Sequence, residues 1–183
     1  MTGGERPTDP DRPAVRGAGD GNDAADDQLA VARTVYTYAY GIDHCDWELY
    51  RSIFAERIDV DFSSYDGAEA MTVTAEEWLG RVQPLFTGLD ATQHTMSNPL
   101  VDLDADGERA RCRMYMQAAH FLTDWPEPEF TIGGFYDDRL RRTADGWRIT
   151  SVTLTVWWRR GDERLMAEAH ARGRRRLRDR RDA

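Results

Sequence analysis

Four histidines supply the groups in this sequence that are best suited to moving a proton, because imidazole titrates near neutral pH. His44 follows Asp43 at what we expect to be an exposed helix end, and His170 lies in an arginine-rich segment near the C-terminus. Neither position favours a catalytic role. His94 and His120, which lie in predicted strands, are therefore the candidates for proton transfer.

His120 is predicted to point into the core, because alternate residues of a strand project to opposite faces. In the strand expected over residues 110–123, the residues that share its face are apolar or small: Cys112, Met114, Met116 and Ala118. Arg111, Arg113 and Gln117, all polar, share the other face. A buried, hydrogen-bonded core histidine is the alternative to a catalytic one. His94 alternates with Met96 and is also expected to face inward.

Asp43 closes the first predicted helix, where the helix dipole disfavours a carboxylate. It is either an ordinary exposed loop residue or an acid held by a cation such as a histidine. A carboxylate that accepts a hydrogen bond from one ring nitrogen fixes the tautomer of a histidine and stabilises its protonated form. A second histidine across a pocket polarises a substrate oxygen or protonates a leaving group. Spacing alone does not bring Asp43, His94 and His120 together.

Helical periodicity begins at Leu29 and ends near Asp43. A short helix capped by Asp46 follows, then an alternating strand around residues 58–62, and then a helix opened by the capping box Thr74–Glu77. Strands are expected next, over residues 93–103, 110–123, 129–141 and 147–158, and a last helix over residues 164–178. Helices followed by a run of antiparallel strands indicate an α+β fold.

Tryptophans are concentrated in the last of these strands. Trp157 alternates with Trp147 and Ile149, so we expect it to pack on their face, whereas Trp158 points the other way. We expect these tryptophans to complete the core or a subunit interface rather than to stack on a substrate.

Charge divides the chain into unlike parts. The net charge is −9, but from Arg159 onward ten arginines outnumber five acids, a local charge of +5 that leaves −14 for the first 158 residues. An acidic body disfavours nucleic-acid binding. No apolar stretch reaches the ~18–20 residues of a membrane span, and no signal peptide is visible. We therefore expect a cytoplasmic protein that binds neither nucleic acid nor membrane.

Three segments follow from composition. Residues 1–27 contain almost no large apolar side chain and are predicted to be a disordered tail. Residues 28–160 form the expected single domain, and residues 161–183 are an arginine-rich helix or tail, with a solvated helix or frayed end favoured. Cys45 and Cys112 are expected to be reduced thiols. No close metal-ligand spacing is present, so we expect no metal site.

Between about Asp27 and Trp158 the chain resembles the SnoaL-like branch of the nuclear transport factor 2 superfamily, and within it scytalone dehydratase and hexachlorocyclohexane dehydrochlorinase. The order and spacing of the following segments carry the resemblance: residues 42–47 (IDHCDW), 57–60 (RIDV), 75–80 (AEEWLG), 92–94 (TQH), 119–120 (AH), 132–136 (IGGFY) and 145–147 (DGW).

The resemblance implies a cone-shaped, cystatin-like fold, in which a curved antiparallel sheet wraps around three N-terminal helices and encloses a pocket. It implies that Asp43 and His94 form a proton-abstracting pair and that His120 is the second pocket histidine. It also implies elimination chemistry without metal or organic cofactor, and a homo-oligomer, trimer or dimer. The expected substrate contacts are Tyr40, Val60, Tyr65, Met116 and Tyr136.

Several positions depart from the scytalone dehydratase pattern. Ile42 and Val60 stand where that enzyme has two tyrosines on a catalytic water, and Gly134 and Tyr136 stand where it has a serine and an asparagine. The substrate is therefore expected to differ from scytalone. Our hypothesis is a cofactor-independent lyase (dehydratase-like), isomerase or cyclase acting on a small, mostly apolar metabolite, with a role in secondary or polyketide metabolism by analogy. A non-catalytic binding or assembly module of the same fold is the alternative.

Overall fold

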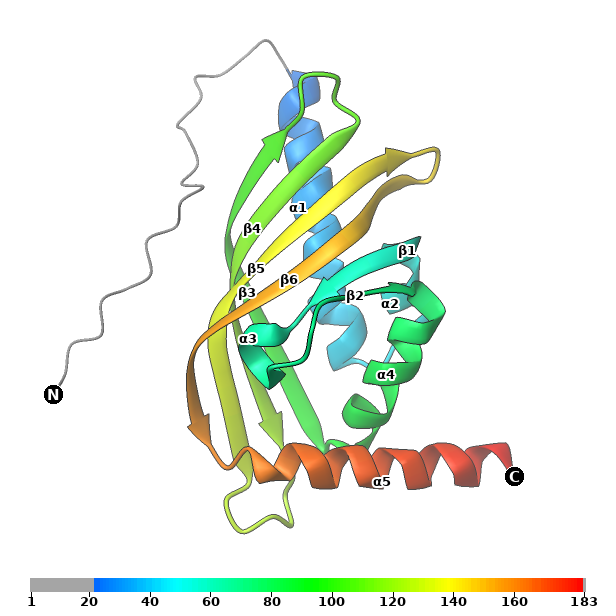
Figure 1. Cartoon of the computed structure of the whole chain (residues 1–183), viewed down its shortest axis with the longest axis vertical. Coiled ribbons are helices and arrows are strands. Elements are labelled where there is room, and N and C mark those ends of the chain that lie inside the picture. Colours follow the sequence, from blue (N-terminus) through cyan, green and yellow to red (C-terminus); the bar gives the residue numbers. More distant parts are fainter. Residues whose placement is uncertain (1–21, 183) are drawn as a thin grey trace, which may run out of the picture.

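The computed structural model describes residues 22–182 of the chain (Figure 1). The first helix, α1 (Asn22–Asp43), starts earlier than expected, so the boundary predicted at Asp27 is corrected to Asn22. Contacts of its first turns explain the difference: Asp27 forms an ion pair with Arg142, and Gln28 Nε2 donates to the Val101 carbonyl at 3.3 Å. The rest of the predicted tail, residues 1–21, lies outside the described residues.

The elements that follow α1 are α2 (Trp47–Ser52), β1 (Phe54–Asp61), α3 (Ser63–Asp66), β2 (Met71–Thr74) and α4 (Ala75–Gly88). Local sequence signals predicted α2, β1 and α4 but not α3 or β2. The Asp46 side chain caps α2 by accepting from Leu49 N at 3.0 Å. The predicted capping box is confirmed, since Thr74 and Glu77 bond each other's backbone N–H groups at the start of α4. Among the described residues, no helix has the length and apolar character needed to cross a membrane.

Four long strands build most of the sheet: β3 (Ala91–Leu103), β4 (Arg109–Phe121), β5 (Glu129–Thr143) and β6 (Gly146–Gly161). The strand order is β2-β1-β6-β5-β4-β3. All neighbouring pairs are antiparallel except β1 and β6, which run parallel and so correct the expectation of a wholly antiparallel sheet. The sheet is strongly curved, with α1, α2 and α4 on one side of it (Figure 1). The expected α+β architecture is confirmed.

Strand register turns both candidate histidines toward the helices. Residue pairing sets His94 of β3 beside Ala118 of β4, and His120 of β4 beside Phe130 of β5. The residues predicted to share the inward face with His120 are all buried: Cys112, Met114, Met116 and Ala118. The alternation of residue types along β4 therefore matches the alternation of inward and outward side chains in the sheet.

Trp157 does not lie on the face of Trp147, as the alternation predicted. The ladder between β5 and β6 slips between Ile149 and Ser151, and again at Trp157. Each extra residue reverses the faces of those that follow. Trp147 is buried, whereas Trp157 is 53% exposed on the outer face, beside Phe135.

The last helix, α5 (Arg164–Arg181), packs against α4 and crosses one end of the sheet (Figure 1). Two glycines allow the close approach. A Cβ at Gly88 would lie 1.7 Å from the Ala169 carbonyl oxygen, and one at Gly173 would lie 1.7 Å from that of Pro84. The arginine-rich segment is thus a helix docked as far as Arg176, not the solvated or frayed end that its charge suggested.

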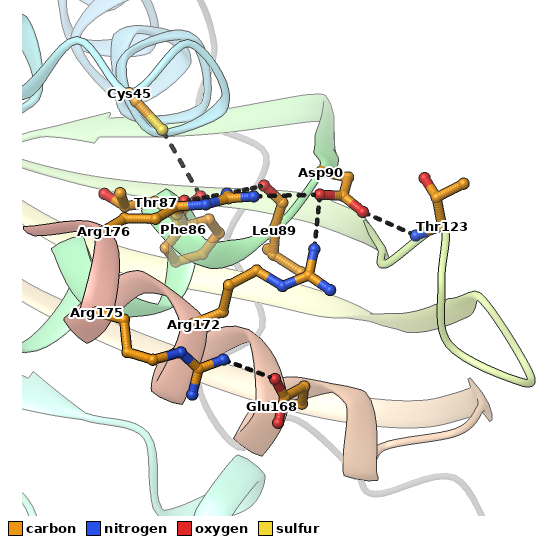
Figure 2. Close-up of polar contacts among 10 residues, drawn as sticks. All are labelled: Cys45, Phe86, Thr87, Leu89, Asp90, Thr123, Glu168, Arg172, Arg175 and Arg176. Atoms are coloured by element: carbon orange, nitrogen blue, oxygen red, sulfur yellow. Dashed lines mark hydrogen bonds and ion pairs between the residues drawn. The ribbon is translucent and has the colours of Figure 1, made fainter. Parts of the chain in front are cut away.

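Arginines of α5 also fasten the connection between α4 and β3 (Figure 2). Arg172 Nη1 lies 2.9 Å from the Asp90 carboxylate, whose other oxygen accepts from Thr123 N at 2.9 Å. Arg176 donates to the Thr87 carbonyl at 2.8 Å, at the C-terminal end of α4 where carbonyls lack helical partners. These contacts fix the segment that leads from α4 into the strand carrying His94.

Candidate functional site

Asp43, the last residue of α1, holds His94 of β3 by two contacts. Its Oδ1 lies 2.6 Å from His94 Nδ1, and its Oδ2 accepts from the His94 backbone N–H at 2.7 Å. Both side chains are largely shielded from solvent, 14% exposed for Asp43 and 4% for His94. Since an ionised carboxylate only accepts hydrogen bonds, this geometry assigns the hydrogen to Nδ1 and leaves a lone pair on Nε2.

Aromatic rings surround the His94 imidazole. Its centroid lies 6.4 Å from that of Tyr38 in α1, 5.7 Å from Phe86 in α4 and 5.9 Å from His120 in β4. The two imidazoles are nearly perpendicular, at 88°. The predicted meeting of Asp43, His94 and His120 is therefore present in the structure.

His120 is a neutral base in this structure. It is 2% exposed, and its Nδ1 lies 3.1 Å from the Phe130 carbonyl oxygen, to which it must donate. Burial, together with the nearby His94, lowers the pKa of His120 to about 4. At neutral pH its Nε2 therefore carries a lone pair, and it can accept a hydrogen bond but not donate one.

The predicted substrate contacts divide between interior and surface. Met116, Tyr136 and Val60 are buried, and the first two face inward on the strands beside the histidines. Tyr40 is 58% exposed and stacks on His44 at 4.0 Å. Tyr65, in α3, lies under the Arg159 guanidinium, 5.0 Å from its ring centre.

A hollow of about 400 Å³, open to solvent, lies between the C-terminal half of α1 and the edge strand β3. Asp43 and His94 contribute to its wall, with Tyr36, Ala39, Tyr40, His44, Gln93, Thr95 and Met96. Among the described residues, no group of three or more His, Cys, Asp or Glu side chains is arranged to hold a metal ion. The enclosed pocket expected between helices and sheet stays a prediction.

Sequence reasoning missed three buried polar side chains near this site. Tyr38 and Tyr50 are 4% and 0% exposed, and Tyr38 contacts the His94 ring. Asp138 of β5 is 2% exposed, and its Oδ1 has no hydrogen-bond partner. A signal existed for Tyr38, because it lies in the apolar stripe of α1 with Val35 and carries the only hydroxyl in that stripe's last two turns.

Comparison with known proteins identifies the family. The model of the SnoaL-like domain matches residues 23–153, which is most of the chain. The chain belongs to the SnoaL-like domain family. An uncharacterized protein of Mycobacterium tuberculosis, Rv2910c, is 26% identical over 123 residues, which cover 67% of this chain and 80% of that protein.

Solved structures of other proteins share the fold of this SnoaL-like domain. The Kfla4162 protein of Kribbella flavida is 29% identical, with a TM-score of 0.71 over 79% of this chain and 99% of that one. A putative scytalone dehydratase of Novosphingobium aromaticivorans is 20% identical, with a TM-score of 0.65 over 75% and 88%. A hexachlorocyclohexane dehydrochlorinase is 12% identical, with a TM-score of 0.62 over 76% and 91%. These last two show the shared fold.

Proposed function

We propose that this SnoaL-like protein is a cofactor-independent lyase, or an isomerase or cyclase, that begins its reaction by removing a proton from carbon. The observation that carries the proposal is the Asp43–His94 pair, with 2.6 Å between carboxylate and ring nitrogen. In this pair Nε2 is the free base, and the carboxylate stabilises the imidazolium that forms when it takes a proton. The second contact, at 2.7 Å to the His94 backbone, keeps the ring from turning.

His120 enters the proposal as an acceptor. Because its Nδ1 hydrogen is used by the Phe130 carbonyl, Nε2 is available to a hydroxyl of the substrate. The expectation that His120 protonates a leaving group is replaced, since a histidine with a pKa of about 4 holds no spare proton at neutral pH. The proton that His94 removes is then the one returned to the leaving group or to another carbon.

The fold supports elimination as the reaction class. A putative dehydratase and a dehydrochlorinase share it, and each name denotes the loss of a small molecule from adjacent carbons. The side chains around the histidines are mostly apolar or aromatic, among them Phe86, Met116 and Phe130. We therefore propose a small, mostly apolar metabolite that bears a carbonyl group and a leaving group β to it.

Proton exchange tests the first step without knowledge of the natural substrate. Carbonyl compounds of this class are incubated with the protein in deuterated water, and NMR follows the loss of the α-hydrogen signal. Wild type and His170→Gln should exchange at equal rates, because His170 lies in α5 away from the pair. His94→Gln should lose exchange by about 10²–10⁴-fold while keeping its fold. Equal exchange in wild type and His94→Gln would remove the proposal.

A non-catalytic ligand-binding module is the second candidate. Phe86 packs against both imidazoles, and a site so tightly lined with rings suits binding as well as turnover. This candidate predicts that ligands raise the melting temperature of wild type and His94→Gln alike and that neither protein exchanges substrate hydrogens.

We also propose that the protein self-associates through the outer face of the sheet. Exposed apolar side chains gather there, with Tyr115, Trp157 and Leu100 each more than half exposed. Analytical ultracentrifugation tests this, and a monomer at all accessible concentrations contradicts it.

A further inference from the structure

Three tyrosine rings meet inside the fold beside the Asp43–His94 pair. Tyr38 of α1 is central, with ring centroids 5.1 Å from Tyr50 of α2 and 5.3 Å from Tyr136 of β5. All three are buried, with no more than 4% of their surface exposed. Each therefore needs hydrogen-bond partners within the protein or on a bound molecule.

Two hydrogen bonds involve these hydroxyls. Trp78 Nε1 donates to the Tyr50 hydroxyl at 3.0 Å, and the Tyr136 hydroxyl donates to that of Tyr38 at 3.4 Å. Burial raises the pKa of Tyr38, and the hydroxyls of Tyr136 and Tyr50 beside it partly offset that rise. The Tyr38 oxygen is the acceptor in its bond with Tyr136.

Two protons of this cluster are left over. Four donors, the Trp78 indole and the three hydroxyls, take part in two hydrogen bonds, so the O–H groups of Tyr38 and Tyr50 donate no hydrogen bond within residues 22–182. Of these two groups, Tyr38 is the one whose ring meets the His94 ring. A buried donor without an acceptor is costly, which suits a group whose acceptor arrives with a ligand.

The ring that carries the Tyr38 O–H lies next to the base. Tyr38 precedes Asp43 by five residues in α1, and its ring meets the His94 ring edge-on at 6.4 Å and 74°. Neither imidazole can serve a substrate carbonyl in this state, because both Nε2 atoms are acceptors. The tyrosine hydroxyl is the donor that the pair of histidines lacks.

We infer that Tyr38 is a catalytic residue whose hydroxyl donates a hydrogen bond to the carbonyl oxygen of the substrate while His94 removes the adjacent proton. This inference rests on the proposed function. The C–H proton moves to His94 Nε2, and its electron pair makes an enolate whose oxygen accepts from Tyr38. The enolate electrons then expel the β-leaving group, which takes the proton back from His94. Burial keeps the pKa of Tyr38 above its ordinary value, so the hydroxyl retains its proton throughout.

Tyr136 acts through Tyr38 as a positioning residue. Its donated bond orients the Tyr38 oxygen and increases the acidity of its remaining proton. Loss of the Tyr136 hydroxyl should therefore weaken the effect of Tyr38 without abolishing it.

The test compares single-hydroxyl deletions. Tyr38→Phe should lower kcat by about 10²–10³-fold, as expected for one donor at a developing oxyanion, with KM changed little. Tyr136→Phe should lower kcat by a smaller factor. Tyr115→Phe, on the exposed outer face of β4, is the matched control and should behave as wild type. A Tyr38→Phe variant within twofold of the wild-type kcat overturns the inference. If His94→Gln still loses turnover in that case, the proposed function survives it.

A binding measurement gives a readout that is independent of turnover. The 4-nitrophenolate anion mimics an enolate oxygen, and its absorption spectrum distinguishes it from neutral 4-nitrophenol. Wild type and Tyr115→Phe should bind it with equal affinity, and Tyr38→Phe should bind it at least tenfold more weakly. Absence of binding to wild type, or equal binding by Tyr38→Phe, contradicts the assignment. Circular dichroism of each variant verifies that the fold is retained.

Discussion

Asp43 holds both the side chain and the backbone of His94. One carboxylate oxygen of Asp43 lies 2.6 Å from the ring nitrogen Nδ1, and the other accepts from the His94 backbone N–H at 2.7 Å. A helix end and an edge strand are thereby joined by a single side chain, and the tautomer and orientation of the histidine are set together. The carboxylate also gains a partner that offsets its unfavourable place at the C-terminal end of α1.

Asp43→Asn should reduce turnover by about 10²–10⁴-fold, because the amide lacks the charge that stabilises the imidazolium and presents only one acceptor oxygen. Steady-state kinetics measure the loss. Asp46→Asn is the matched control, since Asp46 only caps α2 and asparagine also caps helices well. Turnover in Asp43→Asn close to that of wild type would show that His94 works without the carboxylate.

His120 should make the protein less stable as the pH falls from about 6.5 to about 4. Its pKa is lowered to about 4 in the folded state, whereas the ordinary value is 6.5, so the unfolded state binds the proton first. The full loss is about 3 kcal/mol at the acid end of this window. Urea unfolding of wild type and His120→Gln across the window measures it. The stability gap between the two proteins should shrink or reverse as the pH falls, and a pH-independent gap contradicts the prediction.

Asp138 should make the protein less stable as the pH rises, which is the opposite of the effect of His120. Burial raises its pKa well above the usual range of a carboxyl group, with the nearby Asp137 adding to the rise. The folded state therefore keeps a proton that the unfolded state releases, and stability contributed by this group is lost as the pH rises from about 4. Asp138→Asn cannot ionise, so its stability relative to wild type should increase with pH. An unchanging difference between pH 4 and pH 8 would contradict the buried, protonated state.

The contact between α4 and α5 should depend on glycine. Gly173→Ala places a Cβ 1.7 Å from the Pro84 carbonyl oxygen, so the helices must separate, at a cost of about 1–3 kcal/mol. Gly80→Ala is the matched control in the same helix pair, because a Cβ there meets no atom within 4 Å. Alanine at that position should stabilise the helix by about 0.5–1 kcal/mol. Equal effects of the two changes in thermal unfolding would mean that α5 is not closely docked.

Sequence patterns were sufficient for the order of the elements other than α3 and β2, which they did not predict, and for the inward face of β4. The alternation from Cys112 to His120 continues without interruption, so the side chains point where the period of two predicts. In β6 the same reasoning placed Trp157 wrongly, because the slip between Ile149 and Ser151 leaves no mark in the pattern of residue types. A bulge is decided by the pairing of two strands, and the period of one strand cannot reveal it.

The proton-abstracting pair of the candidate site was predicted before the structure was known, but its hydrogen-bond donor, Tyr38, was not. The meeting of Asp43 and His94 came from family resemblance, since 51 residues separate them and no local rule joins them. Tyr38 escaped notice because a tyrosine in an apolar helical stripe looks like core. Its importance depends on where Tyr50 and Tyr136 point, which is a property of the packed fold. The docking of α5 was missed for a similar reason. The high arginine content suggested a solvated end, and the glycines Gly88 and Gly173 that allow close packing were not considered.

Hydrogen exchange at the α-carbon of a carbonyl substrate is the most direct test of the central claim, that Asp43 and His94 form a working base. We expect exchange by the wild type in deuterated water, a loss of about 10²–10⁴-fold in His94→Gln, and no change in His170→Gln. Exchange that persists at the wild-type rate in His94→Gln, in a protein shown to be folded, would contradict it.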